Sequence, residues 1–378
     1  MWGKLRESVL GVGPYLEDEQ GRALVLAYLE TLGAAQDVEA QIERLYADPD
    51  VPDPDAAAAP LRAERDALRE RLRADQPLVE RLIEGQVSAV LADEGFGLLG
   101  QVLPPVSMHF TETPVALIVS PRERIAVAAN LDLDALPIEE RESLEARIDA
   151  ALGVSSLIVP LGGLSLYPAM IVEPSAHETA RALARAFEVT AHEWAHHYLV
   201  FYPLGWEYNA RAETRIINET TATFFGRAVA QRVIARYYPE LPVPQYPSFL
   251  AASATPQEVA PQTPPGDPDA PPPFDYAREM GATRARVDFL LWQGMVEAAE
   301  ATMAAQQRKF ARNGYPIRKL NQAYFAFYGG YQGEPGAGGA DPTGPAIEGI
   351  LARSATLEDF LRTMREITGR EALVGMGG

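Results

Sequence analysis

The sequence His192-Glu193-Trp194-Ala195-His196 lies inside a stretch whose apolar residues recur at helical spacing. In a helix, two histidines four residues apart project from the same face and can bind one metal ion together. The carboxylate of Glu193, beside the first histidine, can then reach a water molecule on that metal. This stretch therefore predicts a mostly buried helix that carries the catalytic site of a zinc hydrolase.

The predicted helix has signals at both ends. Ser175 and Glu178, three residues apart, form a capping-box pattern at its start, and Pro203 and Gly205 are expected to end it. Two core histidines bonded to backbone carbonyls are the alternative to a metal site. We favour the metal, because it satisfies polar groups that burial would otherwise leave unpaired.

A tetrahedral catalytic zinc needs a third protein ligand and one open position for water. No histidine follows His197, so a downstream ligand must be a carboxylate, and the candidates are Glu207, Glu213 and Glu219. Glu219 lies in an otherwise apolar stretch, where a charge is costly unless it is paired or bound to metal. Surface ion pairs are expected for the other two. Glu219 is therefore the predicted third ligand.

The remaining histidines are not expected to bind the metal. His177 falls in the first turn of the predicted helix, and His197 is rotated by about a hundred degrees from His196. His109 lies on a predicted strand with no acid or second histidine at metal spacing.

The pair of motifs H-E-x-x-H at 192–196 and N-E-x-x-A at 218–222 resembles the gluzincin zinc metallopeptidases, which include thermolysin-like and alanyl-aminopeptidase-like enzymes. The similarity covers roughly residues 160 to 230. It implies one Zn²⁺ per chain, held by His192, His196 and Glu219, with Glu193 as general base. It also implies a zincin-like fold, in which a mixed sheet packs on the two motif helices beside a mainly helical second lobe.

The chain departs from the family pattern at two places. Thr223 stands where thermolysin-like enzymes have an aspartate that holds a ligand histidine, so another residue must orient that histidine. The strand motif of alanyl-type aminopeptidases is matched only loosely by Ala169-Met170 and Glu173. Glu173 is better explained as an acid that favours the start of a helix than as an anchor for a substrate amine.

The expected reaction is hydrolysis of a peptide bond. Zinc lowers the pKa of its bound water to about 7, and Glu193 takes the proton and later delivers it to the leaving amine. The developing oxyanion needs a donor, for which Tyr324 and Tyr328 are candidates, although tyrosines at helical spacing are more often part of a core. The alternative functions are a non-catalytic zincin-fold binding or scaffold protein with a structural or degenerate metal site, and a metal hydrolase that acts on a non-peptide amide or epoxide. Glu193 favours catalysis, because a structural site has no use for it.

Composition limits the partners. The net charge of −19 and the lack of a basic cluster argue against nucleic acid, and a peptide or protein substrate is expected instead. No stretch approaches the roughly twenty apolar residues of a membrane-spanning helix, and the first residues do not form a signal peptide. The absence of cysteine excludes disulfides and thiolate ligands. It is typical of exported proteins and of proteins from thermophiles, and an extracytoplasmic location is favoured over a cytoplasmic one.

Three units are expected along the chain, in a predominantly helical α+β fold. Residues 1–95 form an N-terminal hairpin of two antiparallel helices, which is expected to serve structural packing and which a partner could bind. Residues 96–205 form a catalytic lobe with a small mixed sheet and the motif helix, and residues 206–378 form a mainly helical lobe that carries the third ligand. The finer predicted elements are helices at 16–47, 61–94, 276–311 and 356–367, and strands at 102–110, 114–119, 157–160 and 167–172.

Overall fold

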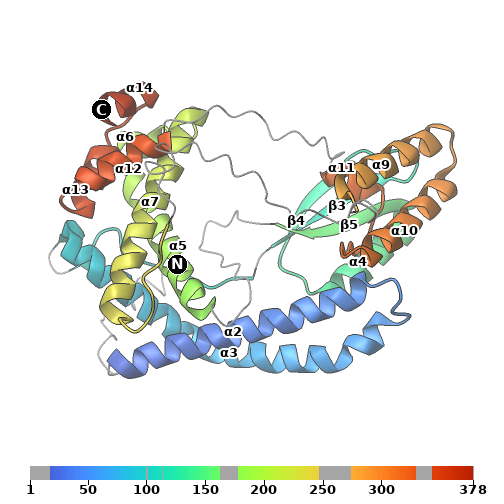
Figure 1. Cartoon of the computed structure of the whole chain (residues 1–378), viewed down its shortest axis with the longest axis horizontal. Helices are drawn as coiled ribbons and strands as arrows, with labels where there is room; N and C mark the ends of the chain where they lie inside the picture. The colour runs from blue at the N-terminus through green and yellow to red at the C-terminus, as the bar shows by residue number, and fades with distance from the viewer. Residues whose placement is uncertain are drawn as a thin grey trace, which may run out of the picture.

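The computed structural model of this chain describes residues 18–98, 101–112, 114–161, 178–246, 274–328 and 343–377. Within these residues the protein is predominantly helical, with a small antiparallel sheet of three strands, so the fold is α+β (Figure 1). The elements in chain order are α2 (Asp18–Ala47), α3 (Pro54–Leu91), the π-turn η1 (Ala92–Phe96), β1 (Gly97–Leu98), β2 (Gln101–Val102), β3 (Val115–Pro121), β4 (Ala129–Leu133), α4 (Ile138–Leu152), β5 (Val154–Pro160), α5 (Glu178–Leu199), α6 (Pro203–Trp206), α7 (Ala212–Tyr237), α9 (Tyr276–Trp292), α10 (Val296–Arg312), α11 (Gln322–Tyr328), α12 (Thr343–Arg353), α13 (Leu357–Met364) and α14 (Arg370–Gly377).

Helices α2 and α3 pack side by side as a hairpin along one side of the molecule (Figure 1). Helix α3 begins at Pro54, earlier than the predicted start near residue 61. The side chain of Asp53 accepts a hydrogen bond from the backbone N–H of Ala56 at 3.0 Å, and Pro54 suits the first helical position because an N–H there would have no helical partner. The alanine-rich residues between the two predicted helices therefore belong to α3.

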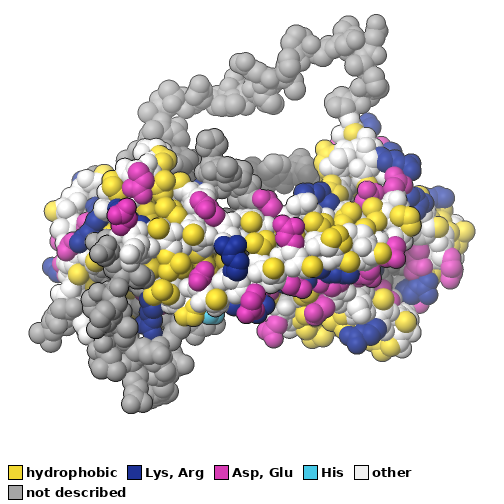
Figure 2. Space-filling view, turned by 90° about the horizontal axis from the view of Figure 1, so that it is seen from below, with side chains coloured by type: hydrophobic (Ala, Val, Ile, Leu, Met, Phe, Trp, Pro, Cys, Tyr) yellow, Lys and Arg dark blue, Asp and Glu magenta, His cyan; other side chains and the backbone are white. Residues whose placement is uncertain are grey.

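The outer face of the hairpin carries acidic and basic side chains in alternation rather than a patch of one sign (Figure 2). Many of them form ion pairs, such as Arg62 with Asp55 at 2.9 Å. Arg65 reaches Glu139 of α4 at 2.7 Å and so ties the hairpin to the neighbouring lobe. These charges are therefore satisfied within the protein or by water.

One hydrophobic core joins α5 and α7 to the C-terminal helices and to part of the hairpin. We call the part of the molecule around this core the helical lobe. Trp194 lies between the two histidines of the motif and is buried in this core, where its ring stacks on Phe225 with 5.7 Å between ring centroids. Its indole N–H donates to the carbonyl of Pro104 at 2.7 Å. Trp194 thus anchors one face of α5 and leaves the face with the histidines turned away from this core.

A second core lies at the other end of the hairpin, and we call the part of the molecule around it the sheet lobe (Figure 1). The strands are ordered β4-β3-β5, and both neighbours of β3 run antiparallel to it. Side chains alternate between the two faces of the sheet, as the two-residue period of a strand requires. Ala116 and Ile118 pack against α9, α10 and α11, whereas Leu117 and Ile158 pack on the face covered by α4.

This arrangement corrects two expectations about the sheet. The described three-stranded sheet is antiparallel, where we predicted a mixed one. We also expected the sheet to pack on the motif helices, but α5 and α7 share their core with the hairpin and the C-terminal helices. The physical reason is that α4 covers one face of the sheet and α9 to α11 cover the other, so neither face is left for α5 or α7.

Strand β5 forms an edge of the sheet, and side chains occupy its outward backbone groups. The N–H of Ile158 donates to Glu145 at 2.5 Å, and its carbonyl accepts from Arg318 at 3.0 Å. The carbonyl of Ser156 accepts from Asn321 at 2.8 Å. Because these side chains take the positions of a neighbouring strand, this edge is closed to an extended peptide at Ile158.

Several element boundaries differ from the prediction. Of the expected strand at 102–110, only Val102 lies in a strand, at the end of β2. The expected helix at 276–311 is interrupted between α9 and α10, where Gly294 has a φ of 74°, a conformation that favours glycine. The predicted strand at 167–172 lies outside the described residues. No helix among the described residues is long and apolar enough to cross a membrane.

Candidate metal centre

Helices α5 and α7 approach each other closely at Gly226. A Cβ atom at this position would lie 2.5 Å from the carbonyl oxygen of Glu188 and 3.2 Å from the Cβ of His192. Any side chain larger than hydrogen would therefore push the two helices apart. Glycine at this position lets α7 bring its own polar side chains to the histidines of α5.

The two helices place His192, His196 and Glu219 together, a group that we call the His–His–Glu cluster. The Nε2 atoms of His192 and His196 lie 3.0 Å apart, and Oε2 of Glu219 lies 3.3 and 3.5 Å from them. Tetrahedral zinc with bonds of roughly 2.0–2.2 Å requires ligand atoms about 3.3 Å apart. The three ligand atoms therefore have the spacing of one face of a zinc tetrahedron.

The cluster is partly buried but can be reached from solvent. The side chains of His192 and His196 are 19% and 21% exposed, and that of Glu219 is 42% exposed. A structural zinc is usually enclosed by four protein ligands, whereas a catalytic zinc keeps one open position. Within the described residues no other group of three or more His, Cys, Asp or Glu side chains brings its ligand atoms together in this way.

Asn218 determines which nitrogen of His196 is available to a metal. Its amide nitrogen donates to the carbonyl of Leu204 at 3.2 Å, which turns the amide oxygen toward Nδ1 of His196, 2.7 Å away. An amide oxygen can only accept a hydrogen bond, so Nδ1 carries the proton. The Nε2 atom of His196 is then left with its lone pair directed into the cluster.

His192 is held more weakly. The hydroxyl of Thr223 lies 3.5 Å from its Nδ1, at the limit of a hydrogen bond. Thr223 therefore occupies the place that the family pattern gives to an aspartate, but it makes a longer contact. The stronger orienting contact in this protein is the one from Asn218 to His196.

Tyr208 fixes the carboxylate of Glu219 from the other side. Its hydroxyl donates to Oε1 at 2.5 Å, so that Oε2 is the oxygen that faces the histidines. This hydrogen bond, together with partial burial, raises the pKa of Tyr208 to about 12. Hydrogen bonds from His192, His196 and Tyr208 hold the pKa of Glu219 far below its usual range, although burial opposes the shift. Glu219 is therefore ionised at neutral pH, as a metal ligand must be.

Glu193 lies beside the cluster without belonging to it. It is half-buried on α5, and its charge contributes to raising the pKa of both His196 and Tyr208. Glu193 directly follows His192 in the sequence, and its carboxylate is not one of the three ligand atoms that lie together. It is thus available as a base rather than consumed as a ligand.

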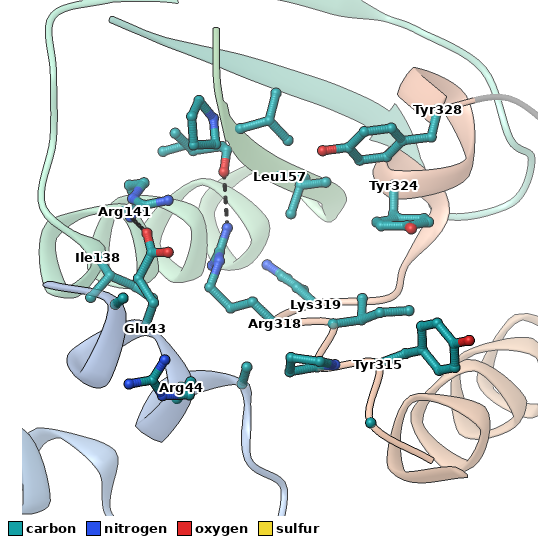
Figure 3. Close-up of a pocket in the computed structure, with 18 of the residues that line it drawn as sticks. Glu43, Arg44, Ile138, Arg141, Leu157, Tyr315, Arg318, Lys319, Tyr324 and Tyr328 are labelled. Atoms are coloured by element: carbon teal, nitrogen blue, oxygen red, sulfur yellow. Dashed lines mark hydrogen bonds and ion pairs between the residues drawn. The ribbon is translucent and has the colours of Figure 1, made fainter. Parts of the chain in front are cut away.

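The structure does not bring Tyr324 and Tyr328 to the cluster, and the prediction that they serve it is therefore wrong. Both residues lie on α11 in the sheet lobe, where they line a separate cavity (Figure 3). Tyr324 is buried in the second core, with its hydroxyl 3.3 Å from that of Tyr276. Tyr324 and Phe325 of the aromatic stripe are thus core, whereas Phe327 and Tyr328 are partly exposed.

The other candidate side chains have structural contacts. Glu207 and Glu213 both pair with Arg211, at 3.6 and 3.3 Å. His197 is exposed, and His109 pairs with Glu80 at 2.7 Å. The positions expected for Ala169, Met170, Glu173, Ser175 and His177 lie outside the described residues.

Sequence reasoning missed Tyr208, Asn218 and Gly226. Asn218 directly precedes the third ligand, so its position in the quoted N-E-x-x-A motif was the available signal. Tyr208 and Gly226 carried no signal, because their roles depend on how α5, α7 and the segment between them come together. No protein-family model, curated protein or solved structure matches this chain. Its function must therefore be inferred from the chemistry of the cluster.

Proposed function

We propose that this protein is a zinc-dependent peptidase in which His192, His196 and Glu219 hold one Zn²⁺ and Glu193 is the general base. The observation that carries the proposal is the spacing of the three ligand atoms, 3.0 to 3.5 Å from one another, beside a second carboxylate that is not a ligand. Two imidazoles and one carboxylate are the donor set of many catalytic zinc sites. A purely structural site would need a fourth ligand rather than a free base.

Zinc bound there would polarise the scissile carbonyl and lower the pKa of a coordinated water to about 7. Glu193 takes the proton from the attacking water and passes it to the leaving amine. The hydrogen bond that Nδ1 of His196 donates to Asn218 keeps the ring in the tautomer that leaves Nε2 free, and the one that Tyr208 donates keeps Oε2 of Glu219 turned toward the histidines. These two contacts support a site whose ligands are oriented in advance.

Tyr208 is also the described hydroxyl best placed to stabilise the oxyanion. Its hydroxyl is 2.5 Å from Glu219, and a pKa of about 12 keeps it protonated at neutral pH. A neutral phenol has one proton, so Tyr208 would donate to negative charge on the substrate carbonyl by releasing its hydrogen bond to Glu219 as that charge develops. In this proposal Tyr208 replaces the pair Tyr324 and Tyr328 as the donor.

The surface next to the cluster favours a substrate with apolar side chains. Val200 directly follows the end of α5, with its N–H donating to the carbonyl of His196, and it is 54% exposed. Ile216, one turn before Glu219 on α7, is 43% exposed, and Trp206 in the connecting segment is 67% exposed. A peptide bound across the cluster would cover these side chains and gain the free energy of burying them.

The likeness to a zincin domain is limited to the two motif helices. The pair α5 and α7 brings the ligands together, but the described sheet packs elsewhere in the molecule. We propose a zincin-like metal centre on a scaffold in which the hairpin and the C-terminal helices surround the motif helices. This scaffold differs from the sheet-backed one that the resemblance implies.

The proposal is tested by measuring zinc content and cleavage of a mixed peptide library by the full chain. We expect one zinc per chain and cleavage that a chelator abolishes and added zinc restores. The Glu193→Gln variant provides the decisive comparison, since it should keep the metal and lose the cleavage. Zinc bound without any cleavage in the unaltered protein would instead support the scaffold function.

A further inference from the structure

A cavity of about 650 Å³ lies in the sheet lobe, apart from the His–His–Glu cluster (Figure 3). It is bounded by the end of α2, the start of α4, strand β5 and the segment between α10 and α11. Its volume falls in the range of small-molecule sites, roughly 300–1,000 Å³. None of the residues proposed for catalysis lines this cavity, so a ligand bound in it would not take part in the proposed reaction.

One wall of the cavity is aromatic. Tyr315 and Tyr276 stack with 4.6 Å between ring centroids, and Tyr324 and Tyr328 lie 4.7 Å apart. Tyr315 and Tyr328 are 40% and 46% exposed, so each presents part of its ring to the open space. Such rings offer a flat apolar surface on which a ligand ring can stack.

The opposite wall is cationic, but two of its charges are already compensated. Arg318 donates to Glu145 at 2.6 Å and to the backbone of β5, and Lys319 donates to Asp149 at 3.0 Å. These ion pairs hold the wall in shape and close the edge of β5. They leave no excess charge for a ligand.

Arg141 and Arg44, which also line the cavity, are different (Figure 3). The side chain of Arg141 is only 7% exposed and pairs with Glu43 at 2.5 Å, yet its Nε has no acceptor among the described residues. This atom is closed off from solvent, so Arg141 lines the cavity with the rest of its side chain and contributes its charge. Arg44 is exposed, and no described residue pairs with its charge.

We infer that this cavity binds a small molecule that combines a ring with one anionic group, a carboxylate or a phosphate. The ring stacks on Tyr315 and Tyr328, and the anion pairs with the guanidinium of Arg44 beside the charge of Arg141. The chain has a net charge of −19, which disfavours anions over most of the surface and so makes this pair of arginines selective for them. Since Arg44 belongs to α2 and the tyrosines belong to the sheet lobe, the ligand joins the hairpin to that lobe.

The test is isothermal titration of the full chain with three probes that share a phenyl ring. Phenylacetate and phenyl phosphate carry an anion, and 2-phenylethanol is the neutral counterpart. We expect at least one anionic probe to bind, with an affinity roughly tenfold or more above that of the neutral probe, because hydrogen bonds to charged groups are the stronger ones. The comparison of the two anionic probes shows whether the natural ligand is a carboxylate or a phosphate.

Two exposed residues provide variants that should leave the fold intact. Arg44→Gln and Tyr328→Leu are each expected to weaken the anionic probe at least threefold. Arg308→Gln, at an exposed arginine of α10 that does not line the cavity, is the matched control and should leave the affinity unchanged. The inference fails if neither anionic probe binds at millimolar concentration, if the neutral probe binds equally well, or if either cavity variant binds like the unaltered protein.

Discussion

The amide oxygen of Asn218 lies 2.7 Å from Nδ1 of His196 and selects the tautomer in which Nε2 can bind a metal. The carbonyl of Leu204 fixes the orientation of the amide from its other end. Asn218 is 1% exposed, so water cannot substitute for either contact. A buried residue outside the His–His–Glu cluster thus orients one of its histidines.

We predict that Asn218→Leu lowers zinc affinity roughly 10- to 100-fold, the effect expected when a partner of a ligand histidine is lost. Thr223→Val is the comparison, because the hydroxyl of Thr223 lies 3.5 Å from His192 and should contribute less. Competition with a chromogenic chelator measures both. Equal losses in the two variants would show that the Asn218 contact has no special role.

Glu193→Gln is expected to keep zinc and lower kcat by roughly 10²- to 10⁴-fold, since the amide cannot accept the proton. Glu207→Gln is the control, because Glu207 lies outside the cluster and pairs with Arg211 on the surface. Steady-state cleavage of a peptide found in the library screen provides the rate. Activity that survives in Glu193→Gln would remove Glu193 from the mechanism.

Glu219→Ala removes a proposed ligand, and its effect on zinc affinity should exceed that of Asn218→Leu. Glu213→Ala, on the same helix and in an ion pair with Arg211, should leave zinc binding unchanged. Elemental analysis of both purified variants measures the difference. Full zinc content in Glu219→Ala would mean that another residue is the third ligand.

In the metal-free protein, Glu219 and His196 should make a pH-dependent contribution to the free energy of unfolding. Burial lowers the pKa of His196, but the hydrogen bond and charge of Glu219 outweigh it and raise that pKa above 6.5; the same partners lower the pKa of Glu219 below 4.5. The stability that His196 contributes is complete below the pKa of the unfolded chain and is lost as the pH rises through the raised pKa of the folded protein. The stability that Glu219 contributes is present above the pKa of the unfolded chain and is lost as the pH falls through the lowered pKa of the folded protein. The pair therefore contributes most between about pH 4.5 and 6.5.

Thermal unfolding of the chelator-treated protein against its Glu219→Gln variant measures this contribution. We expect the difference in Tm to be greatest within that window and to shrink on both sides of it. A difference that does not change with pH would show that the two side chains are not paired in the metal-free state.

Gly226→Ala should destabilise the protein by about 1–3 kcal/mol and weaken zinc binding, because the new Cβ would displace α7 from α5. Gly85→Ala is the control within α3, where a Cβ would meet nothing within 4 Å. That substitution should stabilise the protein by about 0.5–1 kcal/mol, through the lower entropy of the unfolded chain. Chemical denaturation of both variants checks that the two changes have opposite signs.

Patterns within short stretches of the sequence predicted the elements whose formation depends on residues close together in the chain. The four-residue spacing of His192 and His196 implies a shared face wherever the segment is helical, and α5 ends before Pro203 as its breakers indicated. Where local signals competed, the prediction was wrong. The cap of Asp53 and the proline at position 54 begin a helix ahead of residue 61, where we predicted its start. Gly294 divides a segment that we expected to be one helix.

The sequence by itself determined which side chains are available for chemistry. They are two histidines on one helical face, an adjacent acid, and a carboxylate in an apolar stretch whose charge needs a partner. Only the tertiary structure decided that Glu219 meets the histidines, that Tyr208 and Asn218 hold the ligands, and that Tyr324 and Tyr328 belong to another lobe. The physical reason is that residue spacing specifies directions around one helix, whereas contacts between helices depend on which apolar faces are buried together. Here both faces of the sheet were already covered, so α5 packed on α7, and Gly226 allowed the approach that assembles the cluster.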